Sequence, residues 1–233
     1  MTQHDVTPVD PNARRSFLGR LLGGATALTM LGASPALLKA AGTAAGADSV
    51  HPGDDWMREL KAKHRTVFDM SALRNGKPLH QAKNFLDAWR DAFGVPERDV
   101  NLVFGLHGDA IPIVLTDALW SRFKIGEQYE VMDGGTKSAA VHNVFAAANA
   151  AGGRLVTAEQ SVDALQKRGV RFLICMNTIG GATAKLAAAG LGSPEEIRPA
   201  IIGGLLPGVI IVPAMVVALT QLQERGLKYT KIA

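Results

Sequence analysis

The amino-acid sequence predicts a single α/β domain whose mostly parallel sheet carries helices on both faces. Short apolar runs of strand length alternate along the chain with longer segments in which apolar residues recur every three or four positions. The run at 100–106 is apolar at almost every position, as expected for a strand that is covered on both sides. Strands that alternate with helices in this way usually pair in parallel. We expect strands at 66–70, 100–106, 170–174, 208–212 and near 228–232.

The helical segments have recognisable starts and stops. Phe85, Leu86 and Trp89 lie on one face at helical spacing. Thr157 and Gln160 have the spacing of a capping box, in which side chain and backbone satisfy each other's free hydrogen-bond donors. We expect helices at 80–93, 112–123, 157–168, 194 onward (with Ser193 as cap and Pro194 in the first helical position) and 214–225. The segment 127–156 has the weakest pattern, with a turn at 132–136 and an alanine-rich, helical stretch at 144–151.

The N-terminal part of the chain has the layout of an export signal. The motif Arg14-Arg15-Ser16-Phe17-Leu18 matches the twin-arginine pattern, and an apolar stretch at 21–38 follows it. Ala45-Gly46-Ala47 supplies a small-residue cleavage site. We therefore expect a twin-arginine signal peptide at 1–47, a linker at 48–64 and the folded domain at 65–233. A protein exported by this route crosses to the periplasm already folded.

Charge and hydropathy exclude two classes of partner. The signal contains four basic and two acidic residues, so its removal lowers the net formal charge from +4 to +2. No stripe of Lys and Arg with interleaved aromatic residues remains, and nucleic-acid binding is not expected. The uncharged run at 201–219 is near the length of a membrane span, but Pro207, Gly208 and Pro213 divide it. We expect no membrane span after removal of the signal.

Cys175 is the only cysteine, although the expected compartment is oxidising. No disulfide can form within the chain, so the thiol is buried and inert, paired between subunits, or reactive. On the predicted strands it lies at a carboxyl end, and the carboxyl ends of an α/β sheet are where ligands bind. Asp69, His107-Gly108-Asp109, 175–178 and Pro213 all fall at such ends.

These positions define a candidate site. We interpret Cys175 as a nucleophile, presented ahead of a flexible segment at 177–181 whose backbone N–H groups stabilise a thiolate. His107 is the candidate base or cationic neighbour of that thiol. Gly108, Asp109, Asn177 and Thr178 are candidate substrate contacts. The alternatives stay open: Cys175 as a small buried residue, His107 as a structural histidine, and the aspartates Asp69 and Asp109 as loop caps. No nucleotide, metal or haem motif is present, and we expect neither cofactor nor metal.

Several of these segments resemble the DsrE/DsrF-like family, in particular its exported branch. The likeness covers 65–233 and is carried by the first strand, Asn84-Phe85-Leu86, Leu106-His107-Gly108, the run 171–178, and 209–225 with its closing Gln221, Glu224 and Gly226. The resemblance implies a flavodoxin-like subunit that assembles into homotrimers or homohexamers. In the sulfur-relay members a single cysteine carries persulfide sulfur between proteins, and the matching position here is Cys175.

The sequence thus supports two functional hypotheses. The first is a periplasmic sulfur-handling protein, a persulfide carrier or sulfurtransferase-like protein, with a sulfur donor or acceptor protein as its partner. The second is a non-enzymatic oligomeric module that binds a small ligand or metal at the same edge of the sheet.

Overall fold

The computed structural model describes residues 55–146 and 155–232, and these contain one five-stranded parallel sheet. The strand order is β4-β3-β2-β1-β5, and every pairing between neighbours is parallel. The strands are β1 (His64–Met70), β2 (Val100–Leu106), β3 (Arg171–Cys175), β4 (Ile210–Val212) and β5 (Lys228–Ile232). The predicted α/β class, a flavodoxin-like sheet with helices on both faces, is confirmed.

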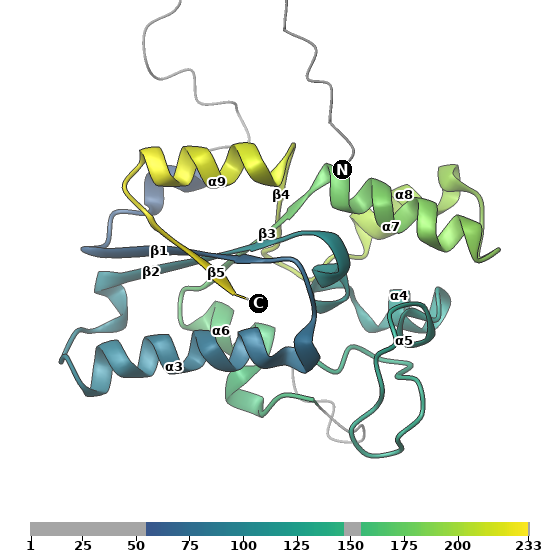
Figure 1. The fold of residues 1–233 in the computed structure, drawn as a ribbon, viewed down its shortest axis with the longest axis horizontal. Coiled ribbons are helices and arrows are strands. Elements are labelled where there is room, and N and C mark those ends of the chain that lie inside the picture. Colours follow the sequence, from purple (N-terminus) through teal and green to yellow (C-terminus); the bar gives the residue numbers. More distant parts are fainter. Residues whose placement is uncertain (1–54, 147–154, 233) are drawn as a thin grey trace, which may run out of the picture. The chain divides into compact units, whose positions relative to one another are not determined.

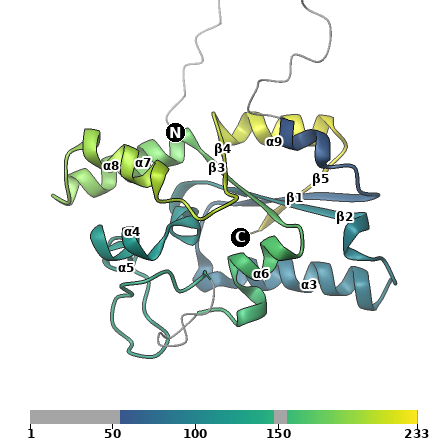
Figure 2. The same cartoon turned by 180° about the vertical axis from the view of Figure 1, so that it is seen from behind.

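Alternate residues of the strands face two separate apolar layers. On β3, Phe172 and Ile174 face one layer, whereas Leu173 and Cys175 face the other. The first layer packs against α3 (Lys77–Asp91) and α6 (Val162–Lys167), the second against α9 (Met215–Glu224) and the short helix η1 (Asp55–Glu59). Figures 1 and 2 show α9 on one side of the sheet and α3 with α6 on the other.

The direction of the strand connections explains this division. From β1 to β4 each new strand is added on the same side of the last, whereas the chain returns from β4 across the sheet to β5. Right-handed crossovers therefore place α3 and α6 on one face and α9 on the other. Cys175 belongs to the α9 layer, which determines the residues that surround its sulfur.

Most of the helix starts predicted from the sequence are present in the structure. Ser193 and Glu196 form the capping box of α8 (Pro194–Gly203), with Pro194 in the first turn. The capping box at Thr157 and Gln160 is also present, but it opens the 3-10 turn η5 (Ala158–Gln160), and Ser161 then caps α6. The expected helix at 157–168 is therefore two short elements. The remaining short helices are η2 (Arg74–Gly76), η3 (Glu97–Asp99) and α5 (Ile125–Gln128).

The prediction of one continuous helix at 112–123 is wrong. The chain instead forms a 3-10 helix, η4 (Gly108–Val114), and then a separate α4 (Asp117–Arg122). Pro112 has no amide hydrogen to donate within a longer helix, and Leu115 and Thr116 are extended before α4 begins. The apolar spacing that suggested one helix comes from the burial of residues 110–114 of η4.

The packed part of the chain includes residues that we expected to be linker. Trp56, Met57 and Leu60 are buried in the α9 layer, and β1 begins at His64 rather than at residue 66. The signal peptide expected at 1–47 lies outside the described residues, as does most of the helix expected at 144–151; Val144 and Phe145 themselves form a turn. The turn expected at 132–136 is present.

No helix among the described residues is long and apolar enough to cross a membrane. The uncharged run at 201–219 is divided among the end of α8, strand β4 and the first half of α9, as the two prolines predict.

Candidate functional site

A cavity of about 470 Å³ lies at the carboxyl ends of β2 and β3, and we call it the Cys175 cavity. Strands β1 to β4 end at the same edge, since Leu106 pairs with both Met70 and Ile174, and Cys175 pairs with Val212. The loop after β2, the start of α7 (Met176–Ala188) and the start of α9 converge there. All six candidate residues line this cavity: His107, Gly108, Asp109, Cys175, Asn177 and Thr178.

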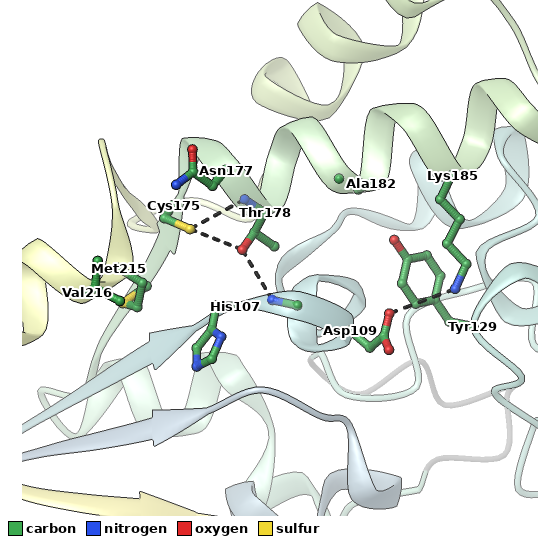
Figure 3. Close-up of a pocket in the computed structure, with 12 residues that line it drawn as sticks. His107, Asp109, Tyr129, Cys175, Asn177, Thr178, Ala182, Lys185, Met215 and Val216 are labelled. Atoms are coloured by element: carbon green, nitrogen blue, oxygen red, sulfur yellow. Dashed lines mark hydrogen bonds and ion pairs between the residues drawn. The ribbon is translucent and has the colours of Figure 1, made fainter. Parts of the chain in front are cut away.

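The Cys175 sulfur lies in the wall of this cavity, at the start of α7. The residue is 3% exposed and has extended backbone angles, because it is the N-cap of the helix. Its Sγ accepts a hydrogen bond from the Thr178 amide at 3.4 Å and lies 3.1 Å from Thr178 Oγ1 (Figure 3). The sulfur thus takes the place that a serine or threonine oxygen usually has in capping a helix.

This geometry surrounds the sulfur with hydrogen-bond donors. Thr178 Oγ1 accepts a hydrogen bond from the Gly108 amide at 3.3 Å, so its own proton is free to point at Cys175 Sγ. The sulfur therefore faces a hydroxyl donor, an amide donor and the positive end of the α7 dipole. The segment at 177–181, expected to be flexible, is the first part of α7, and this regular helix is what fixes the donors.

Gly108 and Gly105 shape the cavity wall next to the sulfur. Gly108 has a φ of +56°, a left-handed conformation that few other residues adopt, and it turns the Gly108 amide towards Thr178. A side chain at Gly105 would put its Cβ 2.8 Å from Met215 Sδ. The absence of one lets Met215, the first residue of α9, pack against β2 at the cavity.

His107 is held by a carboxylate on the neighbouring strand. Its Nε2 lies 2.7 Å from Asp69 Oδ1, and the Tyr229 hydroxyl donates to Asp69 Oδ2 at 2.7 Å. The carboxylate accepts at both oxygens, which assigns the proton of a neutral His107 to Nε2 and leaves Nδ1 as the basic nitrogen. The hydrogen bond that Tyr229 donates to Asp69, together with burial, raises the pKa of Tyr229 above its ordinary value.

His107 does not bind the thiol directly. In Figure 3 its ring points away from Cys175, and among the described residues no hydrogen bond joins the two side chains. The two residues nevertheless line one cavity, and the Gly108 to Thr178 hydrogen bond connects the segments that carry them. A ligand in the cavity, rather than a direct contact, would bring the imidazole and the sulfur into one reaction.

The far end of the Cys175 cavity contains two residues that sequence reasoning missed. Lys185, on the last part of α7, lies 3.9 Å above the ring of Tyr129. Its Nζ also lies 3.9 Å from Asp109 Oδ1, in an exposed ion pair. Tyr129 falls in the weakly patterned segment after α5, where the sequence does not indicate a functional residue. Lys185 was predictable, because it follows Cys175 by ten residues on the same helix.

The described residues contain no group of three His, Cys, Asp or Glu side chains that could hold a metal ion. Cys175 and Met215 offer soft sulfur atoms in the same wall, with His107 in the lining as a nitrogen donor. Their chemistry would suit a soft cation.

Comparisons with known proteins give little further information. No protein-family model matches the chain, and no curated protein matches it. Among solved structures, the chain is similar to a protein of unknown function from Methanobacterium thermoautotrophicum, with 17% sequence identity and a TM-score of 0.39. The match covers 72% of this chain and 99% of that one. A similarity at this level carries no argument about function, and the resemblance to the DsrE/DsrF-like family stays a prediction from the motifs.

Proposed function

We propose that the protein is a sulfur carrier of the DsrE/DsrF-like type, in which Cys175 holds sulfane sulfur as a persulfide. The observation that carries this proposal is the position of the sulfur. It lies in the wall of a cavity large enough for a small organic molecule, and two donors of Thr178 face it. An inert core cysteine requires neither the cavity nor the donors.

The transfer step is a thiolate exchange. The Cys175 thiolate attacks the outer sulfur of a persulfide R–S–SH, a new S–S bond forms at Cys175, and the old S–S bond breaks to release R–S⁻. The proton of the outer sulfur stays with it, and sulfur is passed on without net oxidation or reduction. Donors at Thr178 stabilise the attacking thiolate and, later, the persulfide anion that passes sulfur to an acceptor.

His107 is the proposed proton carrier for this exchange. Asp69 fixes the orientation of the ring through its hydrogen bond with Nε2. A protonated His107 facing the cavity would give its proton to the departing R–S⁻ and take one from the next thiol. This role needs a bound ligand that reaches both His107 Nδ1 and Cys175, because the His107 ring points away from Cys175 in Figure 3.

The setting of the reaction is also part of the proposal. The twin-arginine motif Arg14-Arg15 and the apolar stretch behind it support export of the folded protein to the periplasm. The family resemblance supports a homotrimer or homohexamer that exchanges sulfur with a donor or acceptor protein. Replacing both arginines by lysine is expected to leave uncleaved precursor inside the cell, and normal processing of that variant would contradict the assignment of the signal.

The alternative is a ligand-binding module in which Cys175 is only a wall residue. Its 3% exposure favours this reading, since a thiol that reacts with a protein partner must be reached. The two functions make opposite predictions about transferable sulfur. A carrier releases it to a small acceptor, whereas a binding module does not.

The test uses the mature protein loaded with inorganic polysulfide, freed of excess donor and then treated with cyanide. A carrier yields about one thiocyanate per chain. A Cys175→Ala variant yields none, and because Cys175 is the only cysteine, any residual signal measures contamination. Equal thiocyanate from wild type and variant would overturn the proposed function.

A further inference from the structure

The Cys175 cavity has two polar ends that lie on one face of α7. Cys175 and Thr178 form one end and Lys185 the other, with Gly181 and Ala182 between them. Ten residues of helix separate the Cα atoms of Cys175 and Lys185 by about 15 Å. The small side chains at 181 and 182 leave the space between the ends open.

The far end contains a pair of opposite charges. Lys185 is positively charged, Asp109 is negatively charged, and Tyr129 lies under the lysine with its ring (Figure 3). The 3.9 Å ion pair is long, and the Asp109 side chain is 74% exposed, so the two charges bind each other only weakly. Each therefore keeps the capacity to bind a second, opposite charge.

Tyr129 adds a neutral hydroxyl to this end. Burial, and to a lesser degree the charge of Asp109, raises the pKa of Tyr129 to about 12, so the group stays protonated and can donate. Within the described residues its hydroxyl makes no hydrogen bond, and in Figure 3 it points from the cavity wall towards α7. A second cavity of about 320 Å³ shares Asp109, Tyr129 and Lys185, so the far end is also open beyond the pair.

Resting on the proposed function, the geometry points to the class of sulfur donor: a low-molecular-weight peptide persulfide with a free α-amino-acid group. The carboxylate of that group binds Lys185 and the Tyr129 hydroxyl, and its ammonium binds Asp109. The sulfane sulfur then lies at Cys175. A zwitterion satisfies both members of the pair, whereas a simple anion would face the carboxylate of Asp109.

The size of the cavity excludes donors that are too short to reach both of its ends. Thiosulfate or a short polysulfide would fill a small part of about 470 Å³ and would not reach Lys185. In cysteine persulfide the sulfur lies too close to its own α-carbon to reach both ends. A peptide thiol with a γ-linked amino acid can place the two groups on the order of 10 Å apart, which comes closer than those donors to the distance of about 15 Å between the Cα atoms of Cys175 and Lys185. Glutathione persulfide is therefore the probe of choice.

The transfer reaction keeps the balance already given. Cys175 thiolate attacks the outer sulfur of the peptide persulfide, the S–S bond of the donor breaks, and the peptide leaves as its thiolate. Lys185 and Asp109 bind a part of the donor that does not react. They act as positioning residues, and their effect should appear in selectivity between donors.

The experiment compares three donors on the mature protein: glutathione persulfide, the persulfide of 2-mercaptoethanol, which lacks the amino-acid group, and inorganic polysulfide. The initial rate of sulfur addition to Cys175 is followed by intact mass. The variants are Lys185→Gln and Asp109→Asn, with Lys61→Gln as the matched control, an exposed lysine outside the cavity lining.

We expect wild type to prefer glutathione persulfide over the mercaptoethanol persulfide. Lys185→Gln and Asp109→Asn should each reduce this preference about tenfold, the size expected for one charge-assisted hydrogen bond, and Lys61→Gln should keep it. If wild type shows no preference, or both variants keep it, the inference is wrong while the carrier function stands. If none of the donors, polysulfide included, adds sulfur to Cys175, the proposed function itself fails.

Discussion

The amide of Gly108 donates a hydrogen bond to Thr178 Oγ1 at 3.3 Å and thereby joins the loop after β2 to the first turn of α7. The same oxygen lies 3.1 Å from Cys175 Sγ. One hydroxyl group thus connects the backbone next to His107 with the only thiol of the chain. Because this hydroxyl accepts a hydrogen bond from the Gly108 amide, its own proton remains free to point at the sulfur.

Thr178→Val should remove this connection while keeping the shape of the side chain. We expect a thiol that reacts about tenfold more slowly with iodoacetamide, since the Thr178 amide alone then faces the sulfur. The unfolding free energy should fall by about 1–2 kcal/mol because the Gly108 amide loses its acceptor. Thr183→Val is the matched control, since Thr183 is buried on the same helix and, among the described residues, its hydroxyl bonds only to the Ile179 carbonyl. Equal alkylation rates in the two variants would show that the hydroxyl does not activate the thiol.

The pairing of His107 with Asp69 should be visible as energetic coupling. His107→Asn and Asp69→Asn are each expected to slow the loading of Cys175 about tenfold, because Asp69 acts through the imidazole that it holds. The double variant should lose little more than either single variant. His80→Asn, on α3 and outside the cavity lining, serves as control. Additive losses in the double variant would contradict the role given to Asp69.

The two tyrosines of the chain should ionise at unusually high pH. Burial first, and then the charge of Asp109, raises the pKa of Tyr129 to about 12, and the hydrogen bond to Asp69 raises that of Tyr229. A titration by phenolate absorbance should show both groups ionising above about pH 10, the ordinary value. Tyr129→Phe should remove the later transition. Two tyrosines that ionise together near pH 10 would contradict the described environment.

The same shift predicts how stability depends on pH. The folded state keeps the Tyr129 proton to higher pH than the unfolded state, so its stabilising contribution is complete below about pH 10 and is lost as the pH rises towards 12. The loss of unfolding free energy over this interval should be smaller in Tyr129→Phe than in wild type. Urea denaturation of both proteins at matched pH values measures the difference.

Arg168 should contribute more to stability than a typical surface arginine. Its Nε donates to Glu97 Oε1 at 2.7 Å, and its Nη2 lies 2.8 Å from Asp87 Oδ1. The Arg168 side chain is 17% exposed. Burial alone would raise the pKa of Asp87, but the hydrogen bonds from Lys83 and Arg168 outweigh burial and lower it.

We therefore expect Arg168→Met to lower the unfolding free energy by about 1–2 kcal/mol, because two half-buried carboxylates each lose one of their partners. Arg98→Met is the matched control, since Arg98 is 83% exposed in a 4.0 Å pair and should change stability by less than about 0.5 kcal/mol. Chemical denaturation measures both, and equal losses would contradict the structural role of Arg168.

Short-range patterns predicted the elements that carry Cys175. The apolar run before it, the caps at Ser193 and the stops at glycines are local signals, and they placed the thiol at a carboxyl end of the sheet. The structure brings the six candidate residues into one cavity because parallel strands end together. Predicting that these residues converge required only the order of strands and helices along the chain.

Interactions between distant segments could not be predicted. Asp69 pairs with a histidine 38 positions away and a tyrosine 160 positions away, and no spacing in the sequence encodes either contact. Tyr129 lies in a segment whose shape depends on tertiary hydrogen bonds: Asn143 donates to the carbonyls of Ile113 and Leu115 and pins that segment to η4. The helix expected at 112–123 failed for the related reason that burial of a 3-10 helix imitates helical apolar spacing.

The most direct test of the central claim is the intact mass of the mature protein after treatment with polysulfide and then with a thiol-blocking reagent. The account predicts that wild type gains one sulfur atom beneath the blocking group, that the added mass maps to the peptide containing Cys175, and that reduction removes it. A wild-type protein whose Cys175 gains no sulfur while folded, but reacts fully once unfolded, would contradict the account and assign the thiol to the core.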